Sequence, residues 1–468
     1  MKKAFFFTVL LISSMSLLAQ SESAVGLENN FLANPGDNSV VRNWKNGYTL
    51  SSHAANGFTH FVKTDYGLIN ATSGSTAYYS ALIADSISDI IVSDMRIVDD
   101  YAFFCGSIWD SIAPQTYIQH GILGCFDIQE MYATNTLAIK LHVYDSIREF
   151  GRMVAYKDTT DYKVVALGTY REYDTSYSVY RYPSCLVEDY IMTSVSSITI
   201  RKIQPFNVSG TQREEMMDLV LSGEYVVLVG RLYFPNPPIN SNYSICIRLA
   251  NKDDVINDPM LDNHYVYNTV DQEVNNIIRA VALNENHIAI SYVYPYTPED
   301  FFTRLRVIEI PSMTMIASQQ FKTYTKDEPI ELAYDPRNDI LTLLHTMPFQ
   351  TLFSYNNSYF VQIKPHSKVP YSAPVLFPQK GLYSSLDMFN SEYYVATGQN
   401  FWYYQHTSAP QPNINLCPKT NEINIDPIHT LNTIVSPMPN INITTYYHHN
   451  TKYSIVKPTI INLLCDDK

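Results

Sequence analysis

The stretch MMDLVLSGEYVVLVG, residues 216–230, contains two short apolar strands separated by a polar turn. Val, Leu and Tyr suit the half-buried surface of a β-sheet. Ser222, Gly223 and Glu224 are typical of the tight turn that joins two antiparallel strands. The stretch therefore predicts a β-hairpin, and its first strand begins with a charge at Asp218.

The same pattern recurs along the chain: a charged residue, an apolar strand, a polar turn and a second apolar strand that usually ends in glycine. The six charged heads are Asp94, Arg152, Asp218, Arg279, Glu331 and Asp387, and successive heads are 58, 66, 61, 52 and 56 residues apart. A seventh unit fits upstream in SVVRNWKNGYTLSS, residues 39–52. Such a period indicates a repeat architecture.

Further apolar strands lie between these hairpins, for example at residues 243–250 and 301–310, which gives four strands per repeat. This layout resembles the β-propeller superfamily, in which radial repetition protects the sheet edges. The resemblance implies an all-β fold with seven four-stranded blades over residues 25–408 and a C-terminal β-rich tail at 409–468. The last blade lacks a fourth strand, which we expect from residues 24–30 or from the tail.

Two alternatives to this arrangement stay open. Six or eight blades would also accommodate repeats of this length. A pair of β-sandwiches would also show short strands at regular spacing, although a sandwich gives no reason for a charged head in every repeat. The sequence carries no Trp-Asp repeat, kelch double glycine or Asp-box, so it predicts the architecture and no particular propeller family.

The charged heads are the candidate site. In a propeller the first strand of each blade lines the central channel, so the resemblance implies that all six heads lie near one level. Their signs mostly alternate, which avoids the cost of an unpaired buried charge. We expect a structural ring of ion pairs facing channel water, with Arg42 as the partner of Asp387. A ligand-binding or catalytic ring made of the same residues is the second interpretation.

Composition narrows the function classes. The net charge is −13 and the basic residues are scattered, so the chain lacks the basic stripe that a nucleic-acid partner requires. No metal-binding or cofactor-binding motif is present. Paired carboxylates could serve glycoside hydrolysis. We expect a non-catalytic binding or scaffolding protein for a protein or glycan partner, with a carbohydrate-active or other hydrolytic enzyme as the alternative.

Tyrosine is abundant at 37 residues, and YREYDTSYSVYRY, residues 170–182, places several rings around a predicted hairpin loop. Aromatic rings of this kind either pack across strands or form a binding surface. Among the tyrosine clusters, this loop is the first candidate for an exposed binding patch.

The N-terminal residues 1–20 combine two lysines, an apolar run and small residues, which predicts a secretory signal peptide. We therefore expect an exported monomer without a membrane span, located in the periplasm, on the cell surface or outside the cell. Six cysteines in an exported chain favour structural roles. Cys105 with Cys125, and Cys417 with Cys465, are the candidate disulfides, which leaves Cys185 and Cys246 as buried thiols.

Overall fold

The structure is a computed structural model, and it describes residues 24–28, 35–44, 48–55, 58–65, 78–83, 90–113, 116–130, 139–159, 161–174, 179–181, 183–192, 199–202, 213–233, 243–267, 277–295, 301–323, 328–346, 358–366, 375–376, 383–389, 393–398, 401–406, 428–430, 443–448, 453–456 and 459–463. The predicted signal peptide at 1–20 lies outside the described residues, as do Cys417 and Cys465. No helix among the described residues has the length and apolar character needed to cross a membrane.

The described strands form seven antiparallel sheets of four or five strands and one two-stranded ribbon. Sheet 1 holds β2 (Pro35–Trp44), β3 (Tyr48–Ala55), β4 (Phe58–Asp65) and β5 (Tyr78–Ile83); sheet 2 holds β6 (Ile90–Val98), β7 (Tyr101–Ala113), β8 (Thr116–Asp127) and β9 (Ile139–Tyr144); sheet 3 holds β10 (Ile147–Asp158), β11 (Asp161–Tyr170), β14 (Ser184–Asp189) and β15 (Thr199–Lys202).

Sheets 4 to 7 follow the same plan. Sheet 4 holds β16 (Arg213–Ser222), β17 (Tyr225–Tyr233), β18 (Tyr243–Asn251) and β19 (His264–Tyr267); sheet 5 holds β20 (Arg279–Ala282), β21 (His287–Pro295), β22 (Phe301–Glu309) and β23 (Thr314–Thr323); sheet 6 holds β24 (Glu328–Asp335), β25 (Ile340–Thr346), β26 (Ser358–Ile363) and β27 (Val375–Leu376); sheet 7 holds β28 (Tyr383–Phe389), β29 (Tyr393–Gly398), β30 (Phe401–His406) and β1 (Ala24–Glu28). Two short 3-10 helices, η3 (Lys252–Asp254) and η4 (Pro259–Asp262), lie between β18 and β19.

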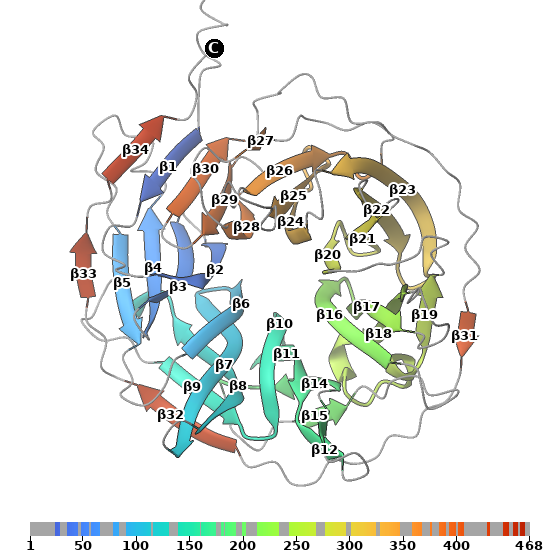
Figure 1. Ribbon diagram of the computed structural model, residues 1–468, viewed down its shortest axis with the longest axis horizontal. Helices are drawn as coiled ribbons and strands as arrows, with labels where there is room; N and C mark the ends of the chain where they lie inside the picture. Colours follow the sequence, from blue (N-terminus) through green and yellow to red (C-terminus); the bar gives the residue numbers. More distant parts are fainter. Residues whose placement is uncertain are drawn as a thin grey trace, which may run out of the picture.

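The sheets are arranged around a common centre, with the first strand of each sheet innermost (Figure 1). Each first strand contacts the first strand of the next sheet, from β2 through β6, β10, β16, β20 and β24 to β28, and β28 contacts β2 again. The prediction of an all-β fold is therefore confirmed, and the fold is β-propeller-like.

Both ends of the chain contribute to sheet 7. Strand β1 pairs with β30 and so supplies a fourth strand from residues 24–28. Four short strands of the C-terminal segment add outer strands: β31 (Ile428–Thr430) pairs with β19, β32 (Ile443–His448) with β9, β33 (Tyr453–Val456) with β5 and β34 (Thr459–Leu463) with β1. The C-terminal segment therefore lies along the rim of sheets 4, 2, 1 and 7 (Figure 1).

The apolar core lies between the faces of neighbouring sheets. Between sheets 1 and 2, for example, the Phe61 ring lies 5.1 Å from that of Phe104 and 4.8 Å from that of Phe126, measured between ring centroids. Separate clusters of buried apolar residues join sheets 2 and 3, 3 and 4, 4 and 5, and 5 and 6. Sheet 4 is covered on both faces by sheets 3 and 5, so residues 226–229 of β17 are apolar at every position and fully buried.

The four described cysteines are all buried thiols, and the predicted bridge between Cys105 and Cys125 is wrong. Cys105 lies opposite Leu123, whereas Cys125 lies opposite Phe103, so the two cysteines are two residues out of register on neighbouring strands. Diagonally placed residues on neighbouring strands lie farther apart than the two Cα atoms that a disulfide joins. Cys185 and Cys246 lie on the third strands of sheets 3 and 4, and the prediction that they are buried thiols is confirmed.

A buried lysine joins sheet 1 to sheet 2. Lys63 is fully buried, and its Nζ lies 3.3 Å from the carbonyl oxygen of Ile128 and 4.1 Å from the centre of the Trp44 ring. Burial lowers the pKa of Lys63 to about 7, although Asp127 and Asp100 favour its charged form. Lys163 is equally buried, but its pKa is raised because a hydrogen bond with Tyr190 and the charge of Glu188, 3.3 Å away, outweigh burial.

We expect the stability of the protein to rise with pH because of Lys63. Its folded-state pKa lies below the unfolded value, so between about pH 7 and pH 10.5 the unfolded chain binds more protons and folding gains stability as the pH increases. The gain is about 2 kcal/mol between pH 7 and pH 9. Lys63→Met removes this pH dependence and stabilises the protein at pH 7, whereas Lys163→Met destabilises it because Glu188 loses its partner. Urea unfolding of both variants at pH 7 and pH 9 measures these effects, and identical pH profiles for wild type and Lys63→Met contradict the assignment.

Candidate functional site

A β-bulge sets the position of most charged heads. The strand register shifts by one residue directly before Asp94, Arg152, Asp218 and Glu331. An extra residue bends a strand and turns the next side chain in a new direction. The bulge therefore explains how each of these strands turns its charged head toward the centre of the ring while the neighbouring apolar residues pack between the sheets.

The glycine that ends the second strand of several repeats is required by this bulge. Gly106 lies opposite the residue that precedes the bulge in β6. A Cβ atom at Gly106 would lie 1.8 Å from the carbonyl oxygen of Ile91, which is far inside contact distance. The same clash arises at Gly168 with Glu149 O at 2.6 Å and at Gly230 with Glu215 O at 2.2 Å. The charged head and the glycine are two parts of one local structure.

Each aspartate head bonds to the main chain of its own sheet and of the next sheet. Asp94 Oδ1 accepts the N–H of Met95 at 2.8 Å, and its Oδ2 accepts the N–H of Met153, which follows the head of sheet 3, at 3.1 Å. The same two bonds recur at Asp218, from Leu219 (2.9 Å) and Ala280 (2.8 Å), and at Asp387, from Met388 (2.9 Å) and Asn43 (2.7 Å). The aspartates therefore fasten sheet 2 to 3, 4 to 5 and 7 to 1.

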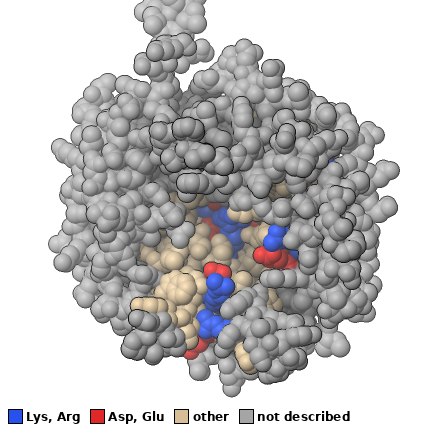
Figure 2. Space-filling model, viewed as in Figure 1, with Lys and Arg blue, Asp and Glu red and all other residues tan. Residues whose placement is uncertain are grey.

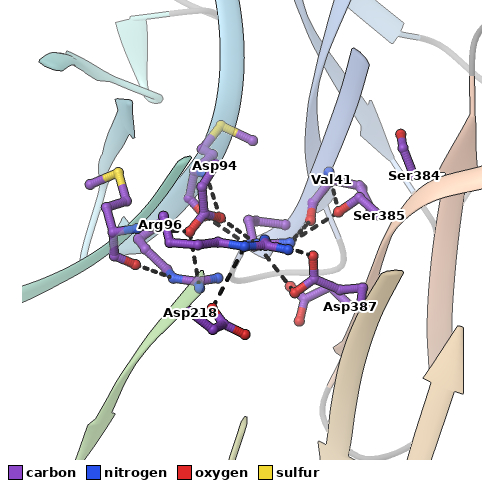
Figure 3. Close-up of polar contacts among 12 residues, drawn as sticks. Val41, Asp94, Arg96, Asp218, Ser384, Ser385 and Asp387 are labelled. Carbon is purple, nitrogen blue, oxygen red and sulfur yellow. Dashed lines mark hydrogen bonds and ion pairs between the residues drawn. The ribbon is translucent and has the colours of Figure 1, made fainter. Parts of the chain in front are cut away.

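The arginine heads connect these carboxylates. Arg42 Nη2 lies 2.6 Å from Asp94 Oδ1, and Arg152 Nε lies 3.6 Å from Asp218 Oδ1. Glu331 of sheet 6 reaches across the centre, with Oε2 3.0 Å from Arg152 Nη1 and Oε1 4.0 Å from Arg42 Nη2. Figure 3 shows Asp94, Asp218 and Asp387 pointing toward a common space from three sides. The heads form one network that spans the ring.

Burial contradicts the expectation of ion pairs facing channel water for Asp94, Asp218 and Arg152. Arg42, Glu331 and Asp387 instead line a pocket at the centre. Asp94 is 0% exposed, Asp218 3%, Arg42 6% and Arg152 8%. The physical reason is that Glu331 lies within ion-pair distance of arginines from two other sheets, so these long side chains contact one another across the ring. Buried charges of both signs in direct contact avoid the large cost of an unpaired ion.

The protonation states follow from this burial. Burial alone would raise the pKa of Asp94, but Arg96 and Arg42 hold that pKa below its ordinary value. Arg152 and Arg42 likewise outweigh burial at Glu331 and lower its pKa. At Asp218 burial dominates over Arg152 and Arg279, so the pKa of that carboxyl is raised.

Arg279 and Asp387 interact with the network through the electrostatic effect of its charges. Burial and the nearby Arg152 lower the pKa of Arg279 to about 10, which still leaves it charged at neutral pH. Burial raises the pKa of Asp387, and Arg42 opposes that rise. Arg42 therefore favours the charged form of Asp387, while its 2.6 Å ion pair is with Asp94, which the sequence did not indicate.

Arg96 is a member of the network that the repeat alignment missed. Its Nη2 lies 3.1 Å from Asp94 Oδ2, and its Nε donates to the carbonyl oxygen of Met153 at 3.0 Å. The signal was present in the sequence, because residues two apart on a strand point to the same face and Arg96 is two residues after Asp94.

A pocket of about 330 Å³ lies beside the network. Its charged lining consists of Arg42, Arg96, Glu331 and Asp387, and its apolar lining comes from the same first strands just after the heads, including Leu221, Val281 and Met388. Figure 2 shows charged side chains of both signs gathered at the centre of this face. The pocket therefore offers both charges and an apolar wall to a small group. Among the described residues, no three His, Cys, Asp or Glu side chains are grouped to hold a metal ion.

Comparison with known proteins gives only distant structural similarity. No known protein family and no curated protein matches the sequence. Among solved structures, the chain is similar to extracellular domains 1–2 of Drosophila semaphorin 1b, with 8% identity, a TM-score of 0.30 and coverage of 83% of this chain and 87% of that one. It is also similar to Drosophila plexin A in complex with semaphorin 1b, with 8% identity, a TM-score of 0.26 and coverage of 81% and 88%. At such TM-scores, the description of the fold depends on the strand pairing alone.

Proposed function

We propose that the chain is an exported, non-catalytic binding protein in which the seven sheets are the seven blades of a closed β-propeller at residues 25–408. The N-terminal sequence at 1–20 supports export. The contact of β28 with β2, reinforced by the bond from Asn43 N–H to Asp387, supports closure between the last and first blades. The four described strands of the tail, β31 to β34, add outer strands to sheets 4, 2, 1 and 7.

The observation that carries the binding role is how the central carboxylates are occupied. Both oxygens of Asp94, Asp218 and Asp387 accept backbone N–H groups, and those bonds join neighbouring sheets. A catalytic carboxyl must instead reach the substrate and exchange a proton with it. The aspartates of this ring therefore have the contacts of structural residues, and the pocket beside them is available for recognition.

The pocket suits a small group on a protein or glycan partner. Glu331 and Arg96 present opposite charges, and Leu221, Val281 and Met388 provide apolar surface. A ligand site commonly combines an apolar wall with a few polar groups that fix orientation. We propose that a protruding group of the partner enters this pocket while the surrounding face makes the wider contact.

Substitution of Met388 tests the pocket. Met388→Trp fills it with a larger side chain, and we expect partner retention in a pull-down from the native envelope to fall about tenfold. Met388→Leu conserves volume and serves as the matched control, which keeps wild-type retention. Equal retention by all three proteins contradicts a role for the pocket, and the absence of any retained partner contradicts the binding function.

One observation favours a hydrolytic enzyme as the second candidate. The pocket contains Glu331, whose pKa is lowered, and Asp387, whose pKa is raised, and carboxyls with diverging pKa values are typical of a catalytic acid and base. A panel of chromogenic glycosides and esters tests this candidate. Hydrolysis that disappears in Glu331→Gln supports the enzyme, whereas no turnover by wild type supports the binding protein.

A further inference from the structure

Three aromatic side chains are exposed on sheet 2 and on the two-stranded ribbon that lies between the second and third strands of sheet 3. Tyr117 is 61% exposed, Tyr173 is 52% and Trp109 is 36%. Trp109 and Tyr117 belong to the long hairpin of β7 and β8, and Tyr173 belongs to the ribbon of β12 (Glu172–Asp174) and β13 (Val179–Arg181). Large aromatic rings left in water in this way commonly mark a recognition surface.

Strand alternation shows which way Trp109 and Tyr117 face. On β7, Phe103 and Cys105 pack in the cluster between sheets 2 and 3, and Trp109 shares their face because it lies an even number of residues further along. On β8, Leu123 belongs to the same cluster, and Tyr117 shares its face for the same reason. Both rings therefore stand on the side of the β7–β8 hairpin that faces sheet 3.

The β12–β13 ribbon lies next to this hairpin. The ribbon lies between β11 and β14, which are the second and third strands of sheet 3. The β7–β8 hairpin joins the second and third strands of sheet 2, so the ribbon and the hairpin turn lie on the same side of the ring of sheets. Arg171 directly precedes β12, and its guanidinium donates to the carbonyl oxygen of Gln119, the residue opposite Trp109. Tyr173, two residues after Arg171, therefore belongs to the segment that this bond attaches to the β7–β8 hairpin.

Polar groups of both signs lie beside the rings. Gln119 is 8% exposed, and its Nε2 lies 2.9 Å from Ser107 Oγ and 3.4 Å from Glu149 Oε2. Its Oε1 accepts the Arg148 Nε–H at 3.1 Å. Arg148 and Arg171 are positive and Glu149 is negative, so the network around Gln119 combines hydrogen-bond donors and acceptors. A ligand with many hydroxyl groups, each of which can both donate and accept a hydrogen bond, suits such a mixed surface.

We infer that this aromatic patch, formed by Trp109, Tyr117 and Tyr173 beside Gln119, binds a neutral oligosaccharide of β-linked, gluco-configured pyranoses. Such a sugar has equatorial hydroxyl groups and axial C–H bonds, so its flat faces are apolar and stack on aromatic rings while its edges form hydrogen bonds. More than one exposed ring suits a ligand with more than one sugar. The inference depends on the proposed binding function and assigns it a ligand class and a site outside the central pocket.

Titration with chitohexaose and cellohexaose tests the inference, with maltohexaose as the comparison sugar. We expect saturable calorimetric binding of at least one β-linked hexaose by the full-length protein. Trp109→Ala and Tyr117→Ala each weaken that binding about tenfold. Ile316→Ala, which alters the 43% exposed Ile316 on sheet 5, leaves the affinity unchanged and serves as the matched control. Trp109→Phe keeps most of the affinity but loses the fluorescence change that the sugar causes at Trp109.

Four results of these experiments would contradict the assignment of a sugar ligand. It is wrong if neither β-linked hexaose binds, or if binding is unaffected by Trp109→Ala and Tyr117→Ala. If a protein partner is captured from the envelope and lost with Trp109→Ala while no hexaose binds, the patch is a protein-docking surface. If a partner is retained by Trp109→Ala and no hexaose binds, the proposed binding function stands and this inference alone fails.

Discussion

Asp94→Ala is expected to lower the free energy of unfolding by about 3–5 kcal/mol, because it leaves buried charges without their partner. Asp94 is fully buried and pairs with Arg42 at 2.6 Å and Arg96 at 3.1 Å. Its carboxylate also accepts the N–H of Met153 and so fastens sheet 2 to sheet 3. The substitution removes these contacts together. Urea denaturation followed by circular dichroism measures the change as a lower midpoint.

Lys157→Met is the matched control for this experiment. Lys157 pairs with Asp99 at 3.4 Å, and both side chains are more than half exposed. An ion pair in water contributes about 0–1 kcal/mol, so we expect the control to unfold close to wild type. Similar midpoints for Asp94→Ala and Lys157→Met contradict the buried network and indicate a hydrated centre.

The fold was predictable because its signals are local. A hairpin needs a polar turn between two apolar strands, and the turn of residues 222–224 shows this directly, with Gly223 at a φ of +56° that favours glycine. The charged heads recur because every sheet repeats the same position relative to the centre. Periodicity along the chain thus carries information about radial arrangement, even though no single hairpin does.

The contacts of the site were not predictable in the same way. Glu331 meets Arg152 across the centre although 179 residues separate them, and only the diameter of the ring decides that their side chains touch. A wider ring would leave water between them, as the sequence led us to expect. The register of β7 against β8 is equally non-local, and it separates Cys105 from Cys125 by a two-residue offset that spacing along the chain does not reveal.

The sequence and the structure give different evidence on whether the acidic heads are catalytic or structural. The sequence identified acidic heads that could serve either catalysis or structure, because spacing says nothing about what occupies their oxygens. The structure shows that backbone N–H groups of neighbouring sheets occupy the oxygens of Asp94, Asp218 and Asp387. It also shows that Glu331 lines the pocket and contacts arginines rather than fastening two sheets as the three aspartates do, so Glu331 is the carboxylate to substitute in a test of catalysis.

Gly106→Ala is the second substitution with a large expected effect, and it tests the link between the bulge and the charged head. The added Cβ would lie 1.8 Å from the carbonyl oxygen of Ile91, and neither atom belongs to a flexible side chain that can move aside. The bulge before Asp94 must then open or the β6–β7 pairing must shift. We expect a loss of about 3 kcal/mol, at the upper end of overpacking costs.

Gly151→Ala separates this clash from the general effect of replacing glycine. Gly151 is the bulge residue itself in β10, and a Cβ there meets no atom within 4 Å. Because alanine restricts the unfolded chain more than glycine does, we expect this variant to unfold within about 1 kcal/mol of wild type. Gly230→Ala, with its Cβ 2.2 Å from Glu215 O, should behave like Gly106→Ala. If all three variants unfold at the same urea concentration, the glycines do not make room for the bulges, and the charged heads must owe their inward direction to another cause.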